Sequence, residues 1–287
     1  KKSVVVGWAC SYCVILLIPI ITIFVNYYFN VRVIRQEIIR VNEQVLSNLK
    51  NSIDELLDDE KTFYSYIYTD EVFESMCIHQ NKGAQFYFDA SKLSEKLKNY
   101  CEYNAGLSSL MYFVDKDYVM NVSSANDSEY FYQSIKFYNR DMQDYETWKE
   151  MMTAEYNNQF LVQTFMHHKT TKECIVYADT LNHNENNKIN LFISIPVDEI
   201  ISMAKNVEDG AKFVISINGA PELVISNGRI IDSEVELKAI GNDDPFFETE
   251  GYIGLHKESQ DKGISYYLLI PDRERGETYQ KCIVYQH

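Results

Sequence analysis

The chain has 287 residues, of which 46% are apolar and 24% are charged, so it has enough length for about two folded domains and too much apolar character for wholesale disorder. Its 42 acidic residues exceed its 27 basic ones and give a formal net charge of -15, which would repel the phosphates of DNA and RNA. These values exclude an unfolded chain and argue against binding to nucleic acid.

The N-terminal segment has the composition of a membrane span. No charged side chain occurs over residues 3–31, and the stretch is long enough to cross a bilayer. It ends in Tyr27, Tyr28 and Phe29, bulky residues that are typical of a membrane interface and unsuited to cleavage by signal peptidase. We therefore predict an uncleaved transmembrane anchor over residues 1–30, with the bulk of the chain outside the cell.

The next segment is predicted to be a long helical stalk over residues 31–82. Neither Pro nor Gly occurs over residues 20–82, which favours one uninterrupted helix. Apolar residues recur every three or four positions over residues 31–67 and skip only Glu60, as on one helix face. Successive steps of four over residues 41–53 depart from a strict heptad, so we expect a dimer seam near the membrane and packing against the chain's own domain further on.

The pattern changes to short strands after residue 107. Two strands around the turn Asp115-Lys116-Asp117 predict a hairpin, a helical region follows, and three further strands come next. Pro196 then opens a helix, as a proline at the first helical position can. The elements of this first module are predicted at residues 110–114, 118–122, 128–152, 159–165, 173–178 and 189–195.

The same order of elements restarts after residue 207. Asn-Gly turns at residues 218–219 and 227–228 separate short strands. Residues 192–199 can be laid over residues 267–274, because the aromatic, apolar, Ile-Pro and Glu positions match. The predicted fold class is therefore α+β, with an N-terminal transmembrane helix, a long stalk helix, and two tandem antiparallel sheet modules flanked by helices. The strands of the second module are predicted at residues 211–217, 222–225, 252–257 and 264–270.

This organisation resembles the double Cache family, the tandem PAS-like extracellular sensors of bacterial receptors, and is similar to the sensors of membrane-bound AraC-type regulators and histidine kinases. The resemblance covers nearly the whole chain and is carried by residues 110–122, 192–199, 213–225 and 263–271. It implies a membrane-distal ligand-binding module over residues 83–206 and a membrane-proximal module over residues 207–272. It also implies a helix over residues 273–287 that returns toward a second span.

The resemblance further implies a ligand pocket between the distal sheet and the helices and loops that cover it. Amino-acid-binding relatives use an Asp near a strand end to receive the ligand's ammonium, and they carry an Arg two residues before a Trp and a Tyr just after it. This chain has Glu146 and Lys149 at those positions, which departs from the amino-acid-binding pattern. Packing or turn roles remain the alternative for each residue that the resemblance places in the pocket lining. These residues are Tyr112, Tyr132, Trp148, Tyr177 and Asp179.

Signals for other chemistry are weak. The sequence contains no G-x-S-x-G, H-E-x-x-H, P-loop or G-x-G-x-x-G motif, so we predict no enzyme, no cofactor and no metal in this portion. Adjacent His167 and His168 would point to opposite faces of a strand, and the acidic loop at residues 242–244 lacks the spacing of a calcium loop. Cys77 and Cys101 could form a disulfide, but the four thiols outside the span permit three connectivities.

Together these patterns predict a membrane-anchored extracellular sensor of a signal-transduction receptor. A small molecule binds in the distal module, and the stalk and return helices pass the change to a cytoplasmic output that this chain does not contain. Near the membrane the apolar faces of two parallel stalks would pack against each other, so we predict a homodimer. A membrane-anchored surface module that binds or assembles without signalling is the alternative. An anchored hydrolase is a third possibility, for which the sequence offers no catalytic cluster.

Overall fold

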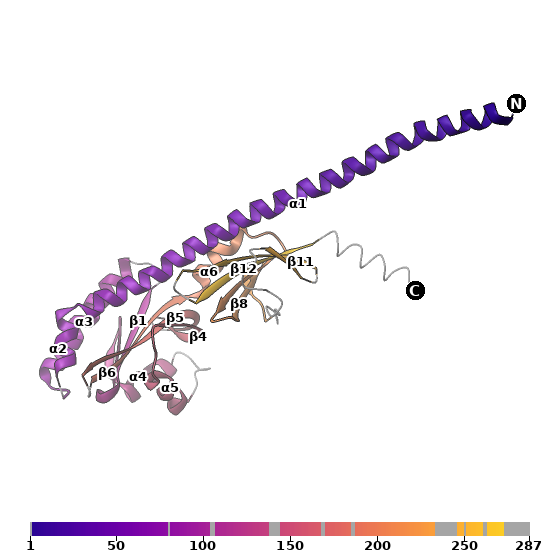
Figure 1. Ribbon diagram of the computed structural model, residues 1–287. Coiled ribbons are helices and arrows are strands. Elements are labelled where there is room, and N and C mark those ends of the chain that lie inside the picture. The colour runs from indigo at the N-terminus through magenta and orange to yellow at the C-terminus, as the bar shows by residue number, and fades with distance from the viewer. Residues whose placement is uncertain are drawn as a thin grey trace.

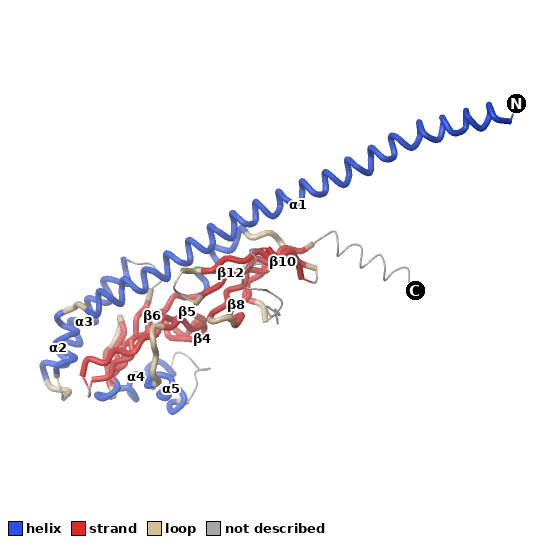
Figure 2. Tube along the Cα trace, in the orientation of Figure 1, coloured by secondary structure: helices blue, strands red, loops and turns tan. Residues whose placement is uncertain are grey.

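A single long helix carries two antiparallel sheets along one side (Figure 1, Figure 2). The computed structural model describes residues 2–79, 81–103, 107–137, 144–167, 170–184, 187–232, 246–249, 251–260 and 263–272. The long helix is α1 (Lys2–Tyr68), and the predicted α+β architecture is confirmed. The return helix predicted at residues 273–287 lies outside the described residues.

The N-terminal part of α1 projects away from both sheets (Figure 1). Among the described residues, α1 is the one helix that is long and apolar enough to cross a membrane, and its apolar window has no buried residue. Pro19 lies inside the helix without ending it. The bulky residues Tyr27, Tyr28 and Phe29 are all exposed at the end of this apolar stretch.

The C-terminal part of α1 packs through one continuous stripe. Buried residues recur there in steps of three and four, as expected for a helix with one face on a core. The stripe includes Glu60, which the apolar periodicity passes over and whose side chain is fully buried. The members of the stripe are Asn42, Leu46, Leu49, Ile53, Leu57, Glu60, Phe63 and Ile67.

The helix ends earlier than an uninterrupted stalk would. α1 stops at Tyr68, and α2 (Glu71–Ile78) begins after a short break. Asp70 N-caps α2, because its carboxylate accepts hydrogen bonds from the backbone N–H groups of Val72 and Phe73. The prediction of one unbroken helix is therefore wrong at this point, since an N-capping side chain starts a new helix instead of continuing the old one. α3 (Ala84–Tyr103) follows and packs on α2.

The first sheet has six antiparallel strands in the order β3-β2-β1-β6-β5-β4. The predicted hairpin is confirmed as β1 and β2, joined by the short 3-10 helix η1 (Val114–Lys116). β5 and β6 extend beyond the strands predicted at residues 173–178 and 189–195, because Asn182 pairs with Lys188. The strands are β1 (Ser108–Phe113), β2 (Tyr118–Asn121), β3 (Ala125–Asp127), β4 (Gln159–His167), β5 (Thr170–Asn184) and β6 (Asn187–Pro196).

Helices flank this sheet on both faces. α1 lies along one face, which we call the inner face, while α4 (Ser128–Lys136) and α5 (Tyr145–Thr153) cover the opposite, outer face (Figure 1). Pro196 N-caps the short helix α6 (Val197–Met203), as the sequence predicts within one residue, and η2 (Ala204–Asn206) leads on to the second sheet.

The second sheet repeats the plan of the first. Its order is β10-β11-β12-β7-β8-β9, so each strand occupies the place of the strand six earlier in the first sheet. Asn218-Gly219 and Asn227-Gly228 all have positive φ, as tight hairpin turns between antiparallel strands require. The strands are β7 (Lys212–Ile217), β8 (Ala220–Ser226), β9 (Arg229–Ile230), β10 (Phe246–Thr249), β11 (Tyr252–Glu258) and β12 (Ile264–Pro271).

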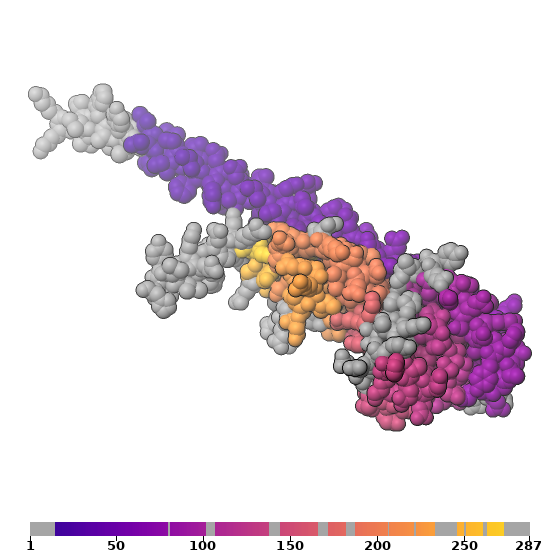
Figure 3. Space-filling view, turned by 180° about the vertical axis from the view of Figure 1, so that it is seen from behind, coloured from indigo at the N-terminus to yellow at the C-terminus, as the bar shows by residue number. Residues whose placement is uncertain are grey.

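One hydrophobic core joins α1 to the inner faces of both sheets. Figure 3 shows both sheets against the same side of the helix. Polar contacts add to this core at the second sheet, where Asp54 of α1 accepts hydrogen bonds from Ser259 Oγ at 2.7 Å and Tyr266 OH at 2.8 Å. Arg35 also pairs with Glu248. A single rigid element therefore contacts both sheets.

Candidate ligand-binding site

The five residues predicted to line a ligand pocket fall on both faces of the first sheet. Tyr112 on β1, Tyr132 on α4 and Trp148 on α5 lie together on the outer face. Tyr177 belongs to the inner core, and Asp179, two residues further along β5, has the same orientation because side chains alternate along a strand. The structure therefore brings three of the five together and separates the other two from them.

The outer-face residues form an aromatic cluster of Tyr112, Phe131, Tyr132, Tyr145 and Trp148. The ring centroid of Trp148 lies 6.2 Å from that of Tyr112 and 5.5 Å from that of Tyr132. Tyr145 contacts both, with centroids 5.2 Å from Tyr132 and 6.0 Å from Trp148. The spacing of these rings along α4 and α5 turns them toward the sheet, and the contact distances are those of favourable edge and offset pairs.

Asp117 brings a carboxylate to the edge of this cluster. It follows η1 in a left-handed conformation, with φ 48°, which asparagine and aspartate tolerate better than most residues. The carboxylate accepts a hydrogen bond from Tyr112 OH and another from Ser128 Oγ at 2.8 Å. Lys149 Nζ lies 3.1 Å from the same oxygen and also over the ring of Tyr145. The aromatic cluster thus ends in a compact polar group.

The charges in this polar group are settled by their neighbours. Burial acts to raise the pKa of Asp117, but hydrogen bonds from Tyr112, Ser128 and Lys149 outweigh it and lower the pKa below its ordinary value. Burial, followed by the hydrogen bond to Asp117, raises the pKa of Tyr112. The hydrogen bond to Asp117 raises the pKa of Lys149. At neutral pH the site therefore holds a carboxylate, an ammonium and a neutral phenol.

On the inner face, Tyr177 and Asp179 contact the stalk helix. The ring of Tyr64 on α1 meets that of Tyr177 edge-on, with centroids 5.8 Å apart. Asp179 accepts a hydrogen bond from the backbone N–H of Asn158 at 3.0 Å. Burial and then a hydrogen bond to Asp179 raise the pKa of Tyr64. These two residues therefore connect the sheet to α1, and the alternate residues of β5, Val176 and Ala178, face the aromatic cluster on the other side.

The sequence did not predict Asp117 or Ser128 as residues of the site. Asp117 was part of a predicted turn, where an acidic residue is ordinary, and Ser128 only began a helical region. Asp117 lies between η1 and β2 with a positive φ, and no local sequence signal distinguishes it from an ordinary turn residue. Lys149 had been noticed only as a departure from the amino-acid-binding pattern.

No metal centre is found among the described residues, where no group of three or more His, Cys, Asp or Glu side chains is placed to hold an ion. His168 and the acidic loop at residues 242–244 lie outside the described residues. Cys77, Cys101 and Cys174 are buried and free, so Cys77 and Cys101 form no disulfide in this structure.

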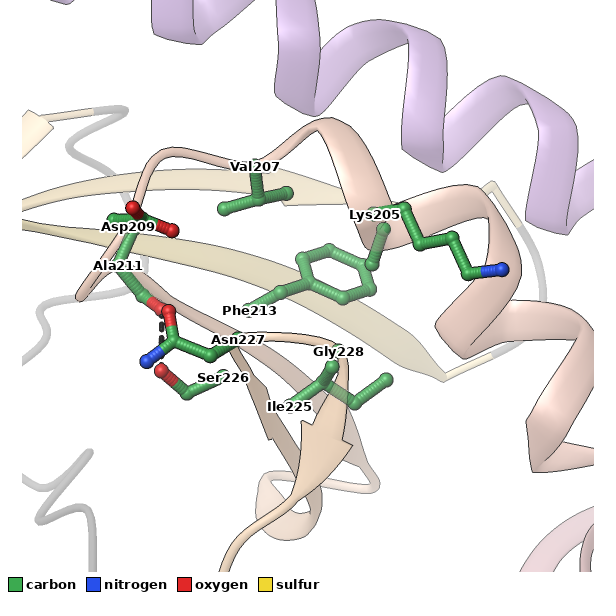
Figure 4. A pocket seen from close by; sticks show the side chains of 10 residues that line it. Lys205, Val207, Asp209, Ala211, Phe213, Ile225, Ser226, Asn227 and Gly228 are labelled. Carbon is green, nitrogen blue, oxygen red and sulfur yellow. Dashed lines mark hydrogen bonds between the residues drawn. The ribbon is translucent and has the colours of Figure 1, made fainter.

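A cavity of about 350 Å³ lies away from the predicted residues, beside the second sheet (Figure 4). It is bounded by the segment that follows α6 and by β7 and β8. A shallower groove of about 480 Å³ lies between α3 and the end of the β2–β3 hairpin. None of the five predicted residues lines either of them.

Comparisons with known proteins identify the fold. A scan against protein-family models and a search of curated proteins found no match. Among solved structures, the sensory domain of the Campylobacter jejuni chemoreceptor Tlp3, solved with isoleucine bound, is 11% identical, with a TM-score of 0.50 over 80% of this chain and 91% of that one. The extracellular domain of the putative histidine kinase rpHK1S-Z16 is 9% identical, with a TM-score of 0.52 over 80% of this chain and 93% of that one.

These similarities are too distant in sequence to transfer a ligand, but they establish the architecture. The chain shares its fold with the sensory domain of this chemoreceptor and with the extracellular domain of this putative histidine kinase. The resemblance to tandem PAS-like, Cache-type sensors is therefore confirmed at the level of the fold.

Proposed function

We propose that this chain is the extracellular, non-enzymatic sensor portion of a bacterial membrane receptor. The observation that carries the proposal is the single helix α1, which joins an exposed apolar segment to the inner faces of two tandem sheets. One structural neighbour is the sensory domain of a chemoreceptor and another is the extracellular domain of a putative histidine kinase, which supports the same interpretation. We assign the membrane anchor to residues 1–30, the stalk to 31–82, the distal module to 83–206 and the proximal module to 207–272.

The ligand site of this proposal is the outer face of the first sheet. Tyr112, Tyr132 and Trp148 form a buried aromatic floor, and the half-exposed carboxylate of Asp117 at its edge supplies an acceptor for a donor group of the ligand. Lys149 already occupies one side of that carboxylate, so a ligand ammonium or hydroxyl competes with its ammonium group. The ligand class is thus a small organic molecule with a hydrogen-bond donor and an apolar or planar body.

We assign transmission of the ligand signal to residues on the inner face of the first sheet. Tyr177 and Asp179 lie on β5 and contact Tyr64 of α1, so a shift of β5 reaches the stalk directly. A ligand biases the equilibrium between two arrangements only by its difference in affinity for them. Because α1 also holds the second sheet through Asp54, the arrangement of both sheets follows the helix.

The stalk also supports a homodimer as part of the proposal. Val33, Ile34, Ile38 and Val41 expose 61%, 59%, 39% and 50% of their surface on the membrane side of the buried stripe. A parallel second copy would cover these side chains, and burial of apolar surface favours association.

A thermal-shift screen of the full chain in detergent micelles tests the proposed site. The panel contains amino acids, carboxylates, sugars, purines and short peptides. A binder present at about 100 times its Kd should raise the Tm by about 5 to 10 °C. Asp117→Asn should remove most of this shift while leaving a cooperative melt, and Glu129→Gln, an exposed carboxylate in the first turn of α4, should leave the shift unchanged.

A second measurement separates binding from transmission. Asp179→Asn should retain the ligand affinity of the unaltered chain but weaken the ligand-dependent cross-linking of an Ile38→Cys stalk. Loss of binding in this variant would instead place Asp179 in the ligand site. A panel without any hit would favour the anchored module that binds or assembles without a small-molecule signal.

A further inference from the structure

The groove between α3 and the β2–β3 hairpin has the size of a small-molecule site, because its volume of about 480 Å³ falls within the usual range of about 300 to 1,000 Å³. One face of α3 forms its first wall, and β2 with the turn that leads to β3 forms the other. α3 lies at the end of the molecule opposite the N-terminus (Figure 1). A ligand in this groove meets many groups that can both donate and accept hydrogen bonds. The lining residues with a hydroxyl group are Tyr87, Ser91, Ser94, Tyr118, Ser123 and Ser124.

Tyr118 contributes a phenol that has no hydrogen-bond partner among the described residues. The residue is only 3% exposed, and its ring lies edge-on to those of Phe86 and Tyr87, with centroids 5.1 Å and 5.8 Å away. Burial raises the pKa of Tyr118 to about 12, so the hydroxyl keeps its proton at neutral pH. A buried hydroxyl group without a partner costs free energy, and a polar group of a ligand in the groove would satisfy it.

The turn after β2 is held in place by the protein itself. The side-chain oxygen of Asn121 accepts hydrogen bonds from the backbone N–H groups of Ser123 and Ser124, both at 2.8 Å. Ser94 Oγ on α3 donates to the backbone carbonyl of Asn121 at 3.0 Å, which joins the two walls of the groove. Ser94 thus uses its one hydroxyl hydrogen within the protein, and its oxygen remains an acceptor for a ligand. A preformed groove of this kind loses little conformational freedom when a ligand binds.

The groove combines an aromatic surface with balanced charge. Tyr87 is 46% exposed and lines the groove. Glu95 and Lys98, both exposed, line it with one charge of each sign. The carbon-bound hydrogens of a sugar ring are attracted to the negative face of an aromatic ring, and sugar hydroxyl groups are good donors to a carboxylate. An aromatic surface, many hydroxyl groups and no net charge together match a neutral saccharide.

We propose that this groove binds a neutral saccharide and is a second ligand site, separate from the aromatic cluster on the first sheet. The sugar ring stacks on Tyr87, one of its hydroxyl groups donates to the carboxylate of Glu95, and another accepts from the hydroxyl group of Tyr118.

The two sites lie on opposite faces of one sheet. Tyr118 and Val119 are consecutive on β2, so their side chains point to opposite sides. Tyr118 belongs to the inner core, whereas Val119 packs with the aromatic cluster on the outer face. The proposal therefore does not depend on the ligand site proposed for the outer face.

Isothermal titration calorimetry on the full chain tests the proposal. The micelles are of an amine-oxide detergent, because maltoside and glucoside detergents would themselves occupy a saccharide site. The probes are glucose, galactose, mannose, N-acetylglucosamine, maltose and cellobiose, and at least one of them should bind. Tyr87→Ala should raise the Kd of that saccharide about tenfold, and Glu95→Gln should raise it about fivefold. Tyr130→Ala on α4 and Glu55→Gln on α1 replace exposed residues outside the groove, so these matched controls should leave the Kd unchanged.

Tyr118→Phe distinguishes a ligand contact from a structural role. It removes only the hydroxyl group that has no partner in the described part of the chain, so the Tm without saccharide should not fall. The Kd of the saccharide should nevertheless rise about fivefold. An unchanged Kd would contradict the contact assigned to this hydroxyl group.

Three results would overturn the proposal. The first is that none of the six saccharides produces binding heat. The second is a Kd that Tyr87→Ala, Glu95→Gln and Tyr118→Phe all leave unchanged. The third is binding that Asp117→Asn abolishes and the groove variants leave intact, because that saccharide occupies the outer face. In the third case the function proposed for the first sheet stands while the groove site fails.

Discussion

Asp54 is the residue through which we expect α1 to hold the second sheet most strongly. Its Oδ1 accepts hydrogen bonds from Ser259 Oγ at 2.7 Å and Tyr266 OH at 2.8 Å, and its Oδ2 lies 2.7 Å from Lys50 Nζ. Tyr266 is fully buried, so its hydroxyl loses its hydrogen-bond acceptor once the carboxylate is gone. Asp54→Ala is therefore predicted to destabilise the attachment of α1 to this sheet.

The size of the effect follows from these contacts. A buried hydroxyl left without its acceptor costs about 1 to 3 kcal/mol, and loss of the bond from Ser259 adds about 1 kcal/mol. The pair with Lys50 contributes about 0.5 kcal/mol at most, because it is an i, i+4 pair near the surface. We expect Asp54→Ala to lower the free energy of unfolding by about 3 kcal/mol.

Urea unfolding of the full chain in detergent micelles, followed by circular dichroism, measures this loss. Tyr266→Phe removes one of the same hydrogen bonds, so the double variant with Asp54→Ala should cost clearly less than the sum of the two single variants. Glu55→Ala, at the exposed neighbouring position on α1, is the control and should change stability by less than about 0.5 kcal/mol. A loss below about 1 kcal/mol for Asp54→Ala, or additive single effects, would refute the reasoning.

Three further predictions concern other parts of the chain. Burial lowers the pKa of His256, so its contribution to stability is present above its unfolded pKa of about 6.5 and is lost as the pH falls from that value through the lower folded pKa. His256→Phe should lack this loss in urea midpoints measured from pH 8 to 5, and an unchanged pH profile would exclude His256 as its cause. Asp70→Ala removes the N-cap of α2 and should lower the free energy of unfolding by about 1 kcal/mol in the same assay, whereas a neutral effect would mean that the cap is dispensable. Ile38→Glu should dissociate the dimer in sedimentation measurements while Gln36→Glu does not, and a chain that sediments as a monomer before substitution contradicts the seam.

Much of the fold was predictable because local patterns and tertiary structure agree. The repeated strand-Pro-helix segment, residues 192–199 and 267–274 in the sequence, anticipates two sheets whose strand orders match position by position. The Asn-Gly pairs anticipate tight turns, and the backbone at Asn218 and Asn227 has the positive φ that such turns need. These features depend on the nearest neighbours in the chain, so the sequence alone is sufficient to find them.

The arrangement of the predicted site depended on distant partners. Tyr177 and Asp179 share an orientation by strand alternation, but the pairing of β1, β6 and β5 decides whether they lie on the same face as Tyr112 or, as found, on the opposite one. A shift of one residue in that register would reverse the faces. Asp70 is a local signal for the start of a new helix, whereas the absence of Pro and Gly over residues 20–82 favours one continuous helix. In this stretch the capping aspartate is the better predictor of where α1 ends.

The two sheets share a strand order, but they differ in the side chains that they offer a ligand. When residues 192 and 267 are aligned, Tyr112 on β1, which pairs with Asn190, corresponds to Ser216 on β7, which pairs with Ser265. The aromatic cluster therefore has no counterpart in the second sheet at its central position, although the backbone is the same. The second sheet instead has its cavity at the connection from α6, on the side nearest the stalk helix (Figure 4). One duplicated backbone thus carries a large aromatic side chain at Tyr112 in the first sheet and a small hydroxyl side chain at Ser216 in the second.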